Sequence, residues 1–345
     1  MSWNGRFNHE SGVNQMGRNV GDFPLEQLRE YKPELTGRPP DFQAFWAGEK
    51  VKMESLRPNV KAARREYPVQ SVEVSDLLFE SWNGTPLNGI FVKPAGAEEC
   101  PVLVCFHGYT GSCGLAADYL KWTALGAAVY SFDVRGQGSS PDYARYENGS
   151  RITGWMLNGI LDHENYYYTN AYRDVILQLQ WTRSQEALVT PSSFGVMGSS
   201  QGGGLALAAA GLGDGVDYMV SDWPFMTHFE RAMDIALQGP YMEVVNYFKW
   251  NDPQGATTDK VKETLSYIDS LHFCDSITCP ALMAVGLEDN VTPPSTVFAA
   301  FNHLGSVEKE IEVYPQFTHE MNGFHEEKKL AFVAKQLNKA GRDLT

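Results

Sequence analysis

The sequence predicts a mixed α/β fold, with a mostly parallel central sheet and helices on both of its faces. Six short, nearly continuous apolar runs lie between residues 101 and 316, and stretches with the apolar spacing of helices separate them. Strands that are apolar along their whole length are buried on both faces, and the helices between them supply the crossovers of a parallel sheet. A hairpin pattern precedes these runs, so we expect antiparallel strands at the start of the sheet.

The first part of the chain has a polar and then a helical character. We expect residues 1–21, which are polar and glycine-rich, to form a tail, and residues 22–345 to form a single domain. An N-terminal helical extension is predicted for about 22–60, with one helix in PLEQLREYKPE and a second in PDFQAFWAGEKVKMESLR. Asp41 stands where the second helix needs an N-cap.

The strands follow in order. VQSVEVSDLLFES and LNGIFVKP flank Trp82-Asn83-Gly84, and Asn-Gly is the strongest short hairpin signal. The six apolar runs predict strands within 101–108, 126–136, 193–199, 218–224, 279–287 and 309–316. Residues of about 225–275 predict a helical insertion before the fifth run. Ligands of parallel sheets bind beyond the carboxyl ends of the strands, so the residues just after each run are the candidates for a site.

Composition excludes several classes of function. The formal net charge is -14, and such acidity disfavours nucleic acid and anionic membranes as partners. No segment resembles a signal peptide, and no window has the roughly 18 apolar residues of a membrane span. The five cysteines include no CxxC pair. We therefore expect a cytoplasmic protein with reduced thiols.

The segment GSSQGGG, between the third apolar run and a helical stretch, indicates a nucleophile. Gly198, Ser200 and Gly202 fit the pattern G-x-S-x-G, in which a tight strand-to-helix turn lifts the serine above the sheet. Ser199 does not fit, because that register would need glycine at Met197 and Gln201. The pattern predicts Ser200 as the nucleophile.

A serine hydroxyl needs a base, and the base needs an acid to orient it. In this type of fold the chain order is serine, acid, histidine. Asp289 follows the fifth run and His319 follows the sixth, so we assign them as acid and general base. Glu288 and Asp222 remain alternative acids. His325 falls near the start of the last helix, where we expect it to be exposed.

The loop after the first run reads FHGYTG, the kind of His-Gly loop that completes an oxyanion hole. We expect the backbone N–H groups of Tyr109 and Gln201 to be the donors and the His107 ring to be structural. His319-Glu320 does not continue to HExxH, and the sequence has neither a P-loop nor a dinucleotide fingerprint. We expect no metal and no cofactor.

Together these motifs resemble carbohydrate esterase family seven, the acetylxylan esterase and cephalosporin-C deacetylase group of the α/β-hydrolases. The resemblance runs from about residue 22 to the end. It rests on PLEQLREYKPELTGRPPDFQAFW, FHGYTG, DVRGQGSS, GWMLNGILDHENYYYTNAYRD, GSSQGGGLALAAA, FERAMDIALQGPY, GLEDNVTPPSTVFAAFNHL and THE. Thr110, Gly239 and Met321 depart from the residues that are commoner in the family.

The resemblance implies an α/β-hydrolase fold and a Ser200, Asp289, His319 triad. It also implies a serine esterase that removes acetyl groups from xylo-oligosaccharides, other small acetylated sugars and cephalosporin C. The implied assembly is a homohexamer built as a trimer of dimers. Arg135 and Gln137 are expected to hold the loop behind the site as a buried polar network. Aromatic residues that could stack on a sugar are Trp155, Tyr166, Trp223, Phe225 and Tyr241.

Two other functions use the same motifs. A serine peptidase of the prolyl-oligopeptidase type shares the elbow and the order of the triad. Those enzymes usually carry a large separate β-propeller, whereas only about 95 residues precede the first central strand here. A hydrolase fold kept as a non-catalytic binding protein is the third hypothesis. Loss of a triad residue would favour it, and no triad residue is missing.

Overall fold

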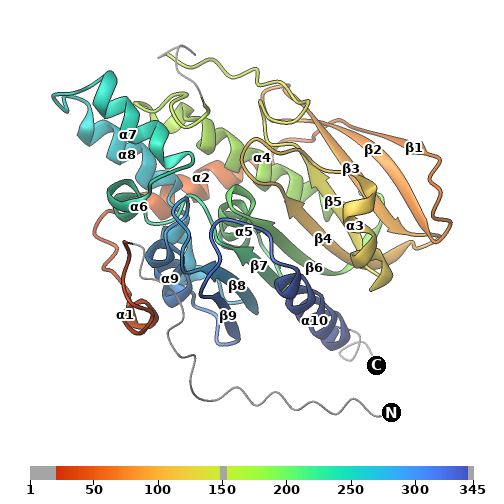
Figure 1. Cartoon of the computed structure of the whole chain (residues 1–345). Coiled ribbons are helices and arrows are strands. Elements are labelled where there is room, and N and C mark those ends of the chain that lie inside the picture. The colour runs from red at the N-terminus through yellow and green to blue at the C-terminus, as the bar shows by residue number, and fades with distance from the viewer. Residues whose placement is uncertain (1–20, 148–153, 341–345) are drawn as a thin grey trace, which may run out of the picture.

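The computed structural model describes residues 21–147 and 154–340 (Figure 1). The expected tail, residues 1–21, lies outside the described residues except for Gly21. Within the described residues, nine strands form one sheet in the order β1-β2-β3-β5-β4-β6-β7-β8-β9. The strands are β1 (Val60–Arg65), β2 (Val72–Glu80), β3 (Pro86–Pro94), β4 (Glu99–Phe106), β5 (Ala128–Phe132), β6 (Thr190–Ser199), β7 (Tyr218–Asp222), β8 (Ala281–Gly286) and β9 (Lys309–Tyr314).

The predicted mixed sheet is confirmed. β1, β2, β3 and β5 pair antiparallel, and from β5 onward every neighbouring pair is parallel. Each of the six apolar runs overlaps one of the strands β4 to β9, although β4 begins two residues and β6 three residues before the predicted run. The expected hairpin is the β2–β3 connection, where Gly84 takes a φ of 81° that glycine adopts without strain. The edge strand β1 was not predicted, because its sequence VKAARR is polar and exposed and shows no alternation.

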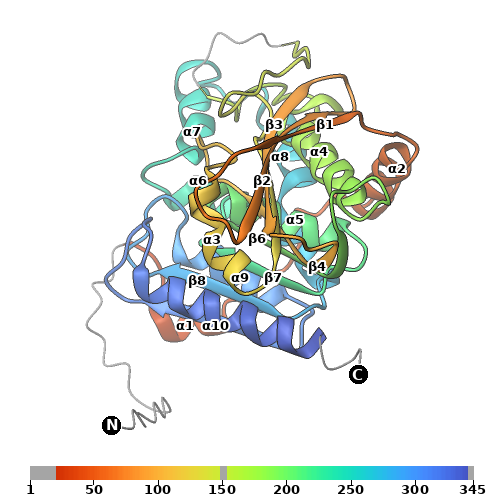
Figure 2. The same ribbon diagram turned by 90° about the vertical axis from the view of Figure 1, so that its right-hand side faces the viewer.

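Helices cover both faces of the sheet (Figures 1 and 2). They are α1 (Leu25–Glu30), α2 (Phe42–Glu54), α3 (Ala116–Ala124), α4 (Tyr167–Thr182), α5 (Gln201–Leu212), α6 (Phe229–Ile235), α7 (Tyr241–Trp250), α8 (Thr258–Ile268), α9 (Pro294–His303) and α10 (Gly323–Ala340), with 3₁₀ turns η1 (His163–Asn165) and η2 (Ser270–Ser276). On one face, Trp122 of α3 and Phe332 of α10 pack in one cluster with Leu103 of β4. The neighbouring Val104 belongs to the large cluster on the other face, which includes α4, α5 and α9.

The helical extension and the insertion pack on each other. The insertion predicted for 225–275 contains α6, α7, α8 and η2, and the two expected N-terminal helices are α1 and α2. Asp41 occupies the predicted N-cap position of α2, and its carbonyl accepts the Phe45 N–H at 2.8 Å, but its side chain makes no capping hydrogen bond. Its carboxylate instead accepts a hydrogen bond from the Tyr267 hydroxyl at 2.6 Å, while Trp46 Nε1 donates to the Tyr267 carbonyl oxygen at 2.8 Å. These bonds fasten α2 to α8.

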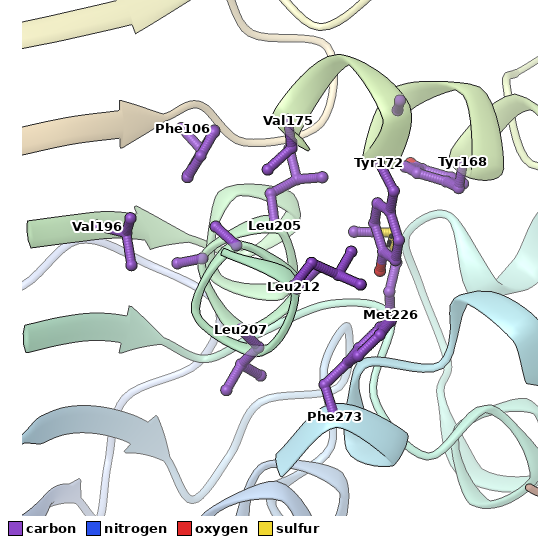
Figure 3. Packing of buried hydrophobic residues seen from close by; sticks show 14 of the residues in the cluster. Phe106, Tyr168, Tyr172, Val175, Val196, Leu205, Leu207, Leu212, Met226 and Phe273 are labelled. Atoms are coloured by element: carbon purple, nitrogen blue, oxygen red, sulfur yellow. Dashed lines mark hydrogen bonds between the residues drawn. The ribbon is translucent and has the colours of Figure 1, made fainter. Parts of the chain in front are cut away.

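The run of glycines after Ser200 allows α5 to approach the sheet very closely. A Cβ added to Gly202 would lie 2.1 Å from the Phe106 carbonyl oxygen, at the end of β4. A Cβ added to Gly204 would lie 2.1 Å from the carbonyl oxygen of Phe225. After the glycines, leucine side chains of α5 pack on the neighbouring elements. In Figure 3, Leu205 and Leu212 lie among the buried side chains of these elements. The glycines are therefore required by close backbone contacts.

Replacing Gly204 with alanine tests this contact. The new methyl group would overlap the Phe225 carbonyl oxygen, and such overpacking costs about 1–3 kcal/mol. We expect the free energy of unfolding of Gly204→Ala to fall by that amount in urea titration. Gly48 in α2 is the matched control, since it is exposed and nothing lies within 4 Å of an added Cβ. Gly48→Ala is expected to raise stability by about 0.5–1 kcal/mol; equal effects of the two substitutions would contradict the argument.

Candidate active site

Ser200 occupies a strained turn between β6 and α5. Its backbone has φ 58° and ψ -120°, a conformation that non-glycine residues rarely adopt. Two backbone hydrogen bonds hold it there: the Ser200 N–H donates to the Asp222 carbonyl at 3.0 Å, and the Phe225 N–H donates to the Ser200 carbonyl at 2.9 Å. The turn leaves no room for a side chain at Gly198, because a Cβ added there would lie 2.2 Å from the Gly202 carbonyl oxygen. Both glycines of the G-x-S-x-G pattern are thus needed to form the turn.

The structure brings Ser200, His319 and Asp289 together. His319 Nε2 lies 2.9 Å from Ser200 Oγ, and His319 Nδ1 lies 2.8 Å from Asp289 Oδ2. The histidine side chain is 21% exposed, whereas the aspartate side chain is fully buried. This geometry lets the imidazole take a proton from the hydroxyl while the carboxylate holds the proton on Nδ1. Of the alternative acids, Glu288 precedes Asp289 in the same turn, but it is Asp289 that pairs with the histidine.

Thr292 is a site residue that the sequence argument did not identify. Its backbone N–H donates to Asp289 Oδ1 at 2.9 Å, and its hydroxyl donates to Asp289 Oδ2 at 2.8 Å. The backbone N–H of Val291 donates to Oδ1 at 2.8 Å. These hydrogen bonds fix the orientation of the Asp289 carboxylate that contacts His319. The signal was present in the sequence as Val291-Thr292, the second and third residues after the acid.

The expected oxyanion donors lie on two elements that meet at Ser200. Gln201 is the first residue of α5, so its N–H belongs to the group of amides that the helix leaves without internal partners. Gly108, just before Tyr109, lies beside the serine: a Cβ added there would be 4.0 Å from Ser200 Cβ. The N-terminus of α5 also carries the positive end of the helix dipole, which favours a developing negative charge.

Gln137 joins these two elements. Its Oε1 accepts the backbone N–H of Thr110 at 2.9 Å, and its Nε2 donates to Gln201 Oε1 at 2.8 Å and to the Tyr167 hydroxyl at 2.9 Å. Thr110 has φ 63°, which is unfavourable for a β-branched residue and suits asparagine better. The hydrogen bond to Gln137 restrains the backbone of this strained residue.

His107 is held neutral by its neighbours. The backbone N–H of Val134 donates to Nε2 at 2.9 Å, so Nε2 carries no proton, and Nδ1 faces the Gly108 carbonyl oxygen at 2.7 Å, so Nδ1 carries one. Burial lowers the pKa of this histidine, in agreement with that arrangement. The ring therefore connects the loop after β4 to the loop after β5.

Arg135 lies fully buried behind the site. Its guanidinium donates to both carboxylate oxygens of Asp174 at 2.7 Å, to Asp142 at 3.1 Å and to Ser81 Oγ at 2.8 Å. Burial alone would lower the pKa of Arg135, but Asp174 outweighs it and raises the pKa. In this structure the side chain does not reach solvent, so it cannot touch a substrate there.

The aromatic residues expected to stack on a sugar are largely buried. Phe225 and Tyr241 are fully buried and Trp223 is 4% exposed. The Tyr241 hydroxyl is satisfied by the backbone of Thr227, and its ring packs 4.5 Å from that of Phe225. These side chains offer no open face to a ligand in this structure. Tyr166 is also fully buried, whereas Trp155 is partly exposed.

The expectation that His325 is exposed was wrong. His325 is fully buried on α10, where Nε2 lies 2.7 Å from Asp222 Oδ1 and Nδ1 lies 3.2 Å from the Tyr314 hydroxyl. Lys329, one turn later, donates to Asp222 Oδ2 at 3.0 Å. Asp222 is thus engaged by His325 and Lys329 and does not pair with His319. Sequence spacing placed His325 near a helix start but gave no sign that Asp222 lies opposite it.

Two other features bear on ligands. A cavity of about 310 Å³ lies between residues 34–37 and helices α6 and α8, where His228 and Asp269 line it and Ser200 does not. In the part of the chain that the structure describes, no group of three or more His, Cys, Asp or Glu side chains is arranged to hold a metal ion.

Comparison with known proteins gives consistent matches. The family model of acetyl xylan esterase (AXE1) matches residues 18–336. A solved acetyl xylan esterase from Paenibacillus sp. R4 is 41% identical with a TM-score of 0.86, covering 90% of this chain and 99% of that one. Acetyl xylan esterase 1 from Thermoanaerobacterium sp. JW/SL YS485 is 34% identical with a TM-score of 0.84, covering 91% of this chain and 99% of that one.

More distant matches agree on the fold. Acetyl esterase Axe7A of Xylanibacter ruminicola is 25% identical over 88% of this chain, which spans 66% of that protein, just under two thirds of its length. An esterase from Pyrococcus furiosus is 17% identical with a TM-score of 0.54, covering 82% of this chain and 99% of that one. The predicted α/β-hydrolase fold is confirmed.

Replacing Asp222 with asparagine tests the buried charge cluster behind Ser200. Burial by itself would raise the pKa of Asp222, but Lys329 and His325 outweigh it and lower the pKa to about 2. A carboxyl whose pKa is lowered on folding stabilises the protein above its unfolded pKa, and this stabilisation is lost as the pH falls through the folded pKa. At pH 7 we expect Asp222→Asn to reduce the free energy of unfolding by about 3–5 kcal/mol.

The difference between wild type and Asp222→Asn is expected to shrink between about pH 4 and pH 2, measured by urea unfolding at each pH. Asp76 on β2 is the matched control, because it is exposed and pairs with Arg65 at 3.2 Å on the surface. Asp76→Asn should change stability by about 1 kcal/mol or less. A penalty for Asp222→Asn that stays constant down to pH 2 would contradict the assignment.

Proposed function

This chain belongs to the acetyl xylan esterase family and is a carboxylic ester hydrolase, and we propose that it removes acetyl groups from small acetylated carbohydrates through an acyl-enzyme on Ser200. One observation carries the proposal: the unbroken hydrogen-bonded chain from Ser200 Oγ through His319 to Asp289, with distances of 2.9 and 2.8 Å. A serine hydroxyl in this arrangement loses its proton as it attacks a carbonyl carbon.

Acylation begins when Ser200 Oγ attacks the acetyl carbonyl and His319 Nε2 takes its proton. The carbonyl oxygen becomes an oxyanion, which the backbone N–H groups of Tyr109 and Gln201 stabilise. Asp289 stabilises the imidazolium that forms. As the tetrahedral intermediate collapses, His319 returns the proton to the sugar oxygen, so the alcohol leaves neutral and the acetyl group stays on the serine.

Deacylation repeats these steps with water. His319 takes a proton from a water molecule, which attacks the acetyl-serine carbonyl, and the same two N–H groups stabilise the second oxyanion. Collapse then returns the proton to Ser200 Oγ and releases acetate. Each oxyanion donor contributes a factor of about 10²–10³ in kcat.

The substrate part of the proposal is supported by the family. The relatives from Paenibacillus and Thermoanaerobacterium are named acetyl xylan esterases and match almost the whole chain. We propose acetylated xylo-oligosaccharides as substrates, with the acetyl ester of cephalosporin C as a further one. Of the five aromatic residues named from the sequence, Trp155 alone is partly exposed, and its ring lies 5.1 Å from that of Tyr109, so we propose that Trp155 contacts the sugar.

Assembly and location remain proposals as well. We propose a homohexamer, on the sequence resemblance alone, and light scattering should then give six times the chain mass of 38.4 kDa. All five cysteines are free thiols, in agreement with the proposed reducing cytoplasm. Separately, no helix among residues 21–147 and 154–340 is long and apolar enough to cross a membrane.

Replacing the nucleophile tests the mechanism. We expect Ser200→Ala to keep its fold and to lose hydrolysis of p-nitrophenyl acetate by a factor of about 10⁴ or more, because no other group can form the acyl-enzyme. Ser199→Ala is the matched control, since Ser199 Oγ bonds to Asp222 at 3.0 Å instead of to His319. Its activity should stay within a few-fold of wild type. Near-normal turnover by Ser200→Ala would rule out the serine mechanism.

A panel of substrates tests the specificity. We expect kcat/KM to be highest for acetyl esters, to fall along the series of p-nitrophenyl acetate, propionate and butyrate, and to be negligible for dipeptide anilides. Release of acetate from acetylated xylo-oligosaccharides and from cephalosporin C is measured on the same protein. Higher turnover of dipeptide anilides than of acetyl esters would instead support the peptidase hypothesis. No adduct on Ser200 after treatment with an organophosphonate would support a non-catalytic binding protein.

A further inference from the structure

Glu243 links the helical insertion to the loop that carries Tyr109. It lies in the first turn of α7. It is not part of the triad, and the sequence analysis did not identify it as a site residue. Its Oε1 accepts a hydrogen bond from the Tyr109 hydroxyl at 2.6 Å, and its Oε2 accepts the backbone N–H of Met156 at 3.0 Å. One carboxylate therefore joins α7, the turn at residues 154–156 and the loop after β4.

The hydroxyl of Tyr109 both accepts and donates a hydrogen bond. It accepts the backbone N–H of Trp155 at 2.8 Å and donates its proton to Glu243. Burial and the neighbouring Glu243 both raise the pKa of Tyr109, so the phenol keeps the proton that it donates. The Tyr109 ring is also packed edge-on against the rings of Trp155 at 5.1 Å and Phe225 at 6.3 Å. The side chain is thus restrained along its whole length.

Gly154 closes the cluster from the other side. Its φ of 102° suits glycine, and a Cβ there would lie only 2.0 Å from Glu243 Oε2. The sequence Gly154-Trp155-Met156 therefore supplies room for the carboxylate and then two backbone N–H donors, one for Tyr109 and one for Glu243. These contacts explain why glycine, tryptophan and methionine follow one another here only through the glycine and the two backbone N–H groups; the sequence alone gave no reason for this motif.

The anchoring of Tyr109 bears on the reaction because its backbone carries one of the proposed oxyanion donors. The next residue, Thr110, has a strained φ of 63°, and its N–H is held by Gln137. The direction of the Tyr109 N–H is then set by two anchors, Gln137 on the main chain and Glu243 on the side chain. An oxyanion donor displaced by a fraction of an ångström loses much of its effect.

We propose that Glu243 is a positioning residue for the oxyanion hole, acting through the Tyr109 hydroxyl from the helical insertion. This inference rests on the proposed serine mechanism. It requires the loss of the Tyr109–Glu243 bond to slow the chemical step while substrate binding changes little. A role in stability alone would lower the melting temperature and leave kcat unchanged.

A double-mutant cycle on the full chain tests the proposal with p-nitrophenyl acetate. We expect Tyr109→Phe and Glu243→Ala each to lower kcat about tenfold, with KM within twofold of wild type. The loss of kcat in the double variant should be clearly smaller than the product of the two single losses, because both substitutions remove the Tyr109–Glu243 bond. Glu243→Gln keeps an oxygen acceptor for Tyr109 but not for Met156, so it should recover part of the loss of Glu243→Ala.

Tyr130→Phe is the matched control. The Tyr130 hydroxyl is also buried and accepts a backbone N–H, that of Leu188 at 3.0 Å, but the residue lies within β5 and its ring packs on Phe91, Phe132 and Trp181. We expect Tyr130→Phe to lower the melting temperature without changing kcat. A boronic acid that forms a tetrahedral adduct with Ser200 should bind Tyr109→Phe more weakly in proportion to the loss in kcat.

The outcomes separate this inference from the function on which it rests. If wild type neither hydrolyses p-nitrophenyl acetate nor forms an adduct on Ser200, the serine mechanism itself is wrong. If wild type is active and folded Tyr109→Phe keeps kcat within twofold, or if the single effects multiply in the double variant, Glu243 has no positioning role. Should Glu243→Ala fail to fold, Glu243→Gln and Tyr109→Phe complete the cycle and decide between these results.

Discussion

The backbone of Ser200 is the constraint on which the rest of the site depends. A non-glycine residue at φ 58° is costly, and it persists only where its surroundings leave no other conformation. Here the carbonyl of Asp222 and the N–H of Phe225 bind the two sides of the Ser200 peptide unit. The glycines at 202 and 204 let α5 approach β4 and the segment after β7. Because of this close contact, Ser200 stands above the sheet at the N-terminus of a helix.

Buried charges connect the segments that surround this turn. Arg135 bonds to Asp174 of α4, and Asp222 bonds to His325 and Lys329 of α10. Buried ion pairs are weak evidence for stability, since desolvation offsets most of the attraction. Their geometry is strict, however, and each one joins residues far apart in the chain. They join the segment after β5 to α4 and the end of β7 to α10.

The helical insertion and the N-terminal extension both lie outside the sheet, but hydrogen bonds connect them to the loop beside Ser200. The extension packs on the insertion through Asp41 and Trp46, and the insertion reaches Tyr109 through Glu243. In this way segments outside the sheet contact the loop beside Ser200. Variation among related esterases in the insertion would then change the site without altering the triad.

The strands β4 to β9, the turn at Ser200 and the hairpin could be predicted from the sequence, because each depends on a local pattern of apolar spacing or glycine. The same patterns predicted Ser200, Asp289 and His319 as a candidate triad, because each follows an apolar run. The pairing of carboxylates and histidines required the three-dimensional structure, because Asp222 ends β7 and Asp289 follows β8, and either could have been the partner of His319. That choice depends on where α10 crosses the sheet, a long-range contact that no short segment encodes.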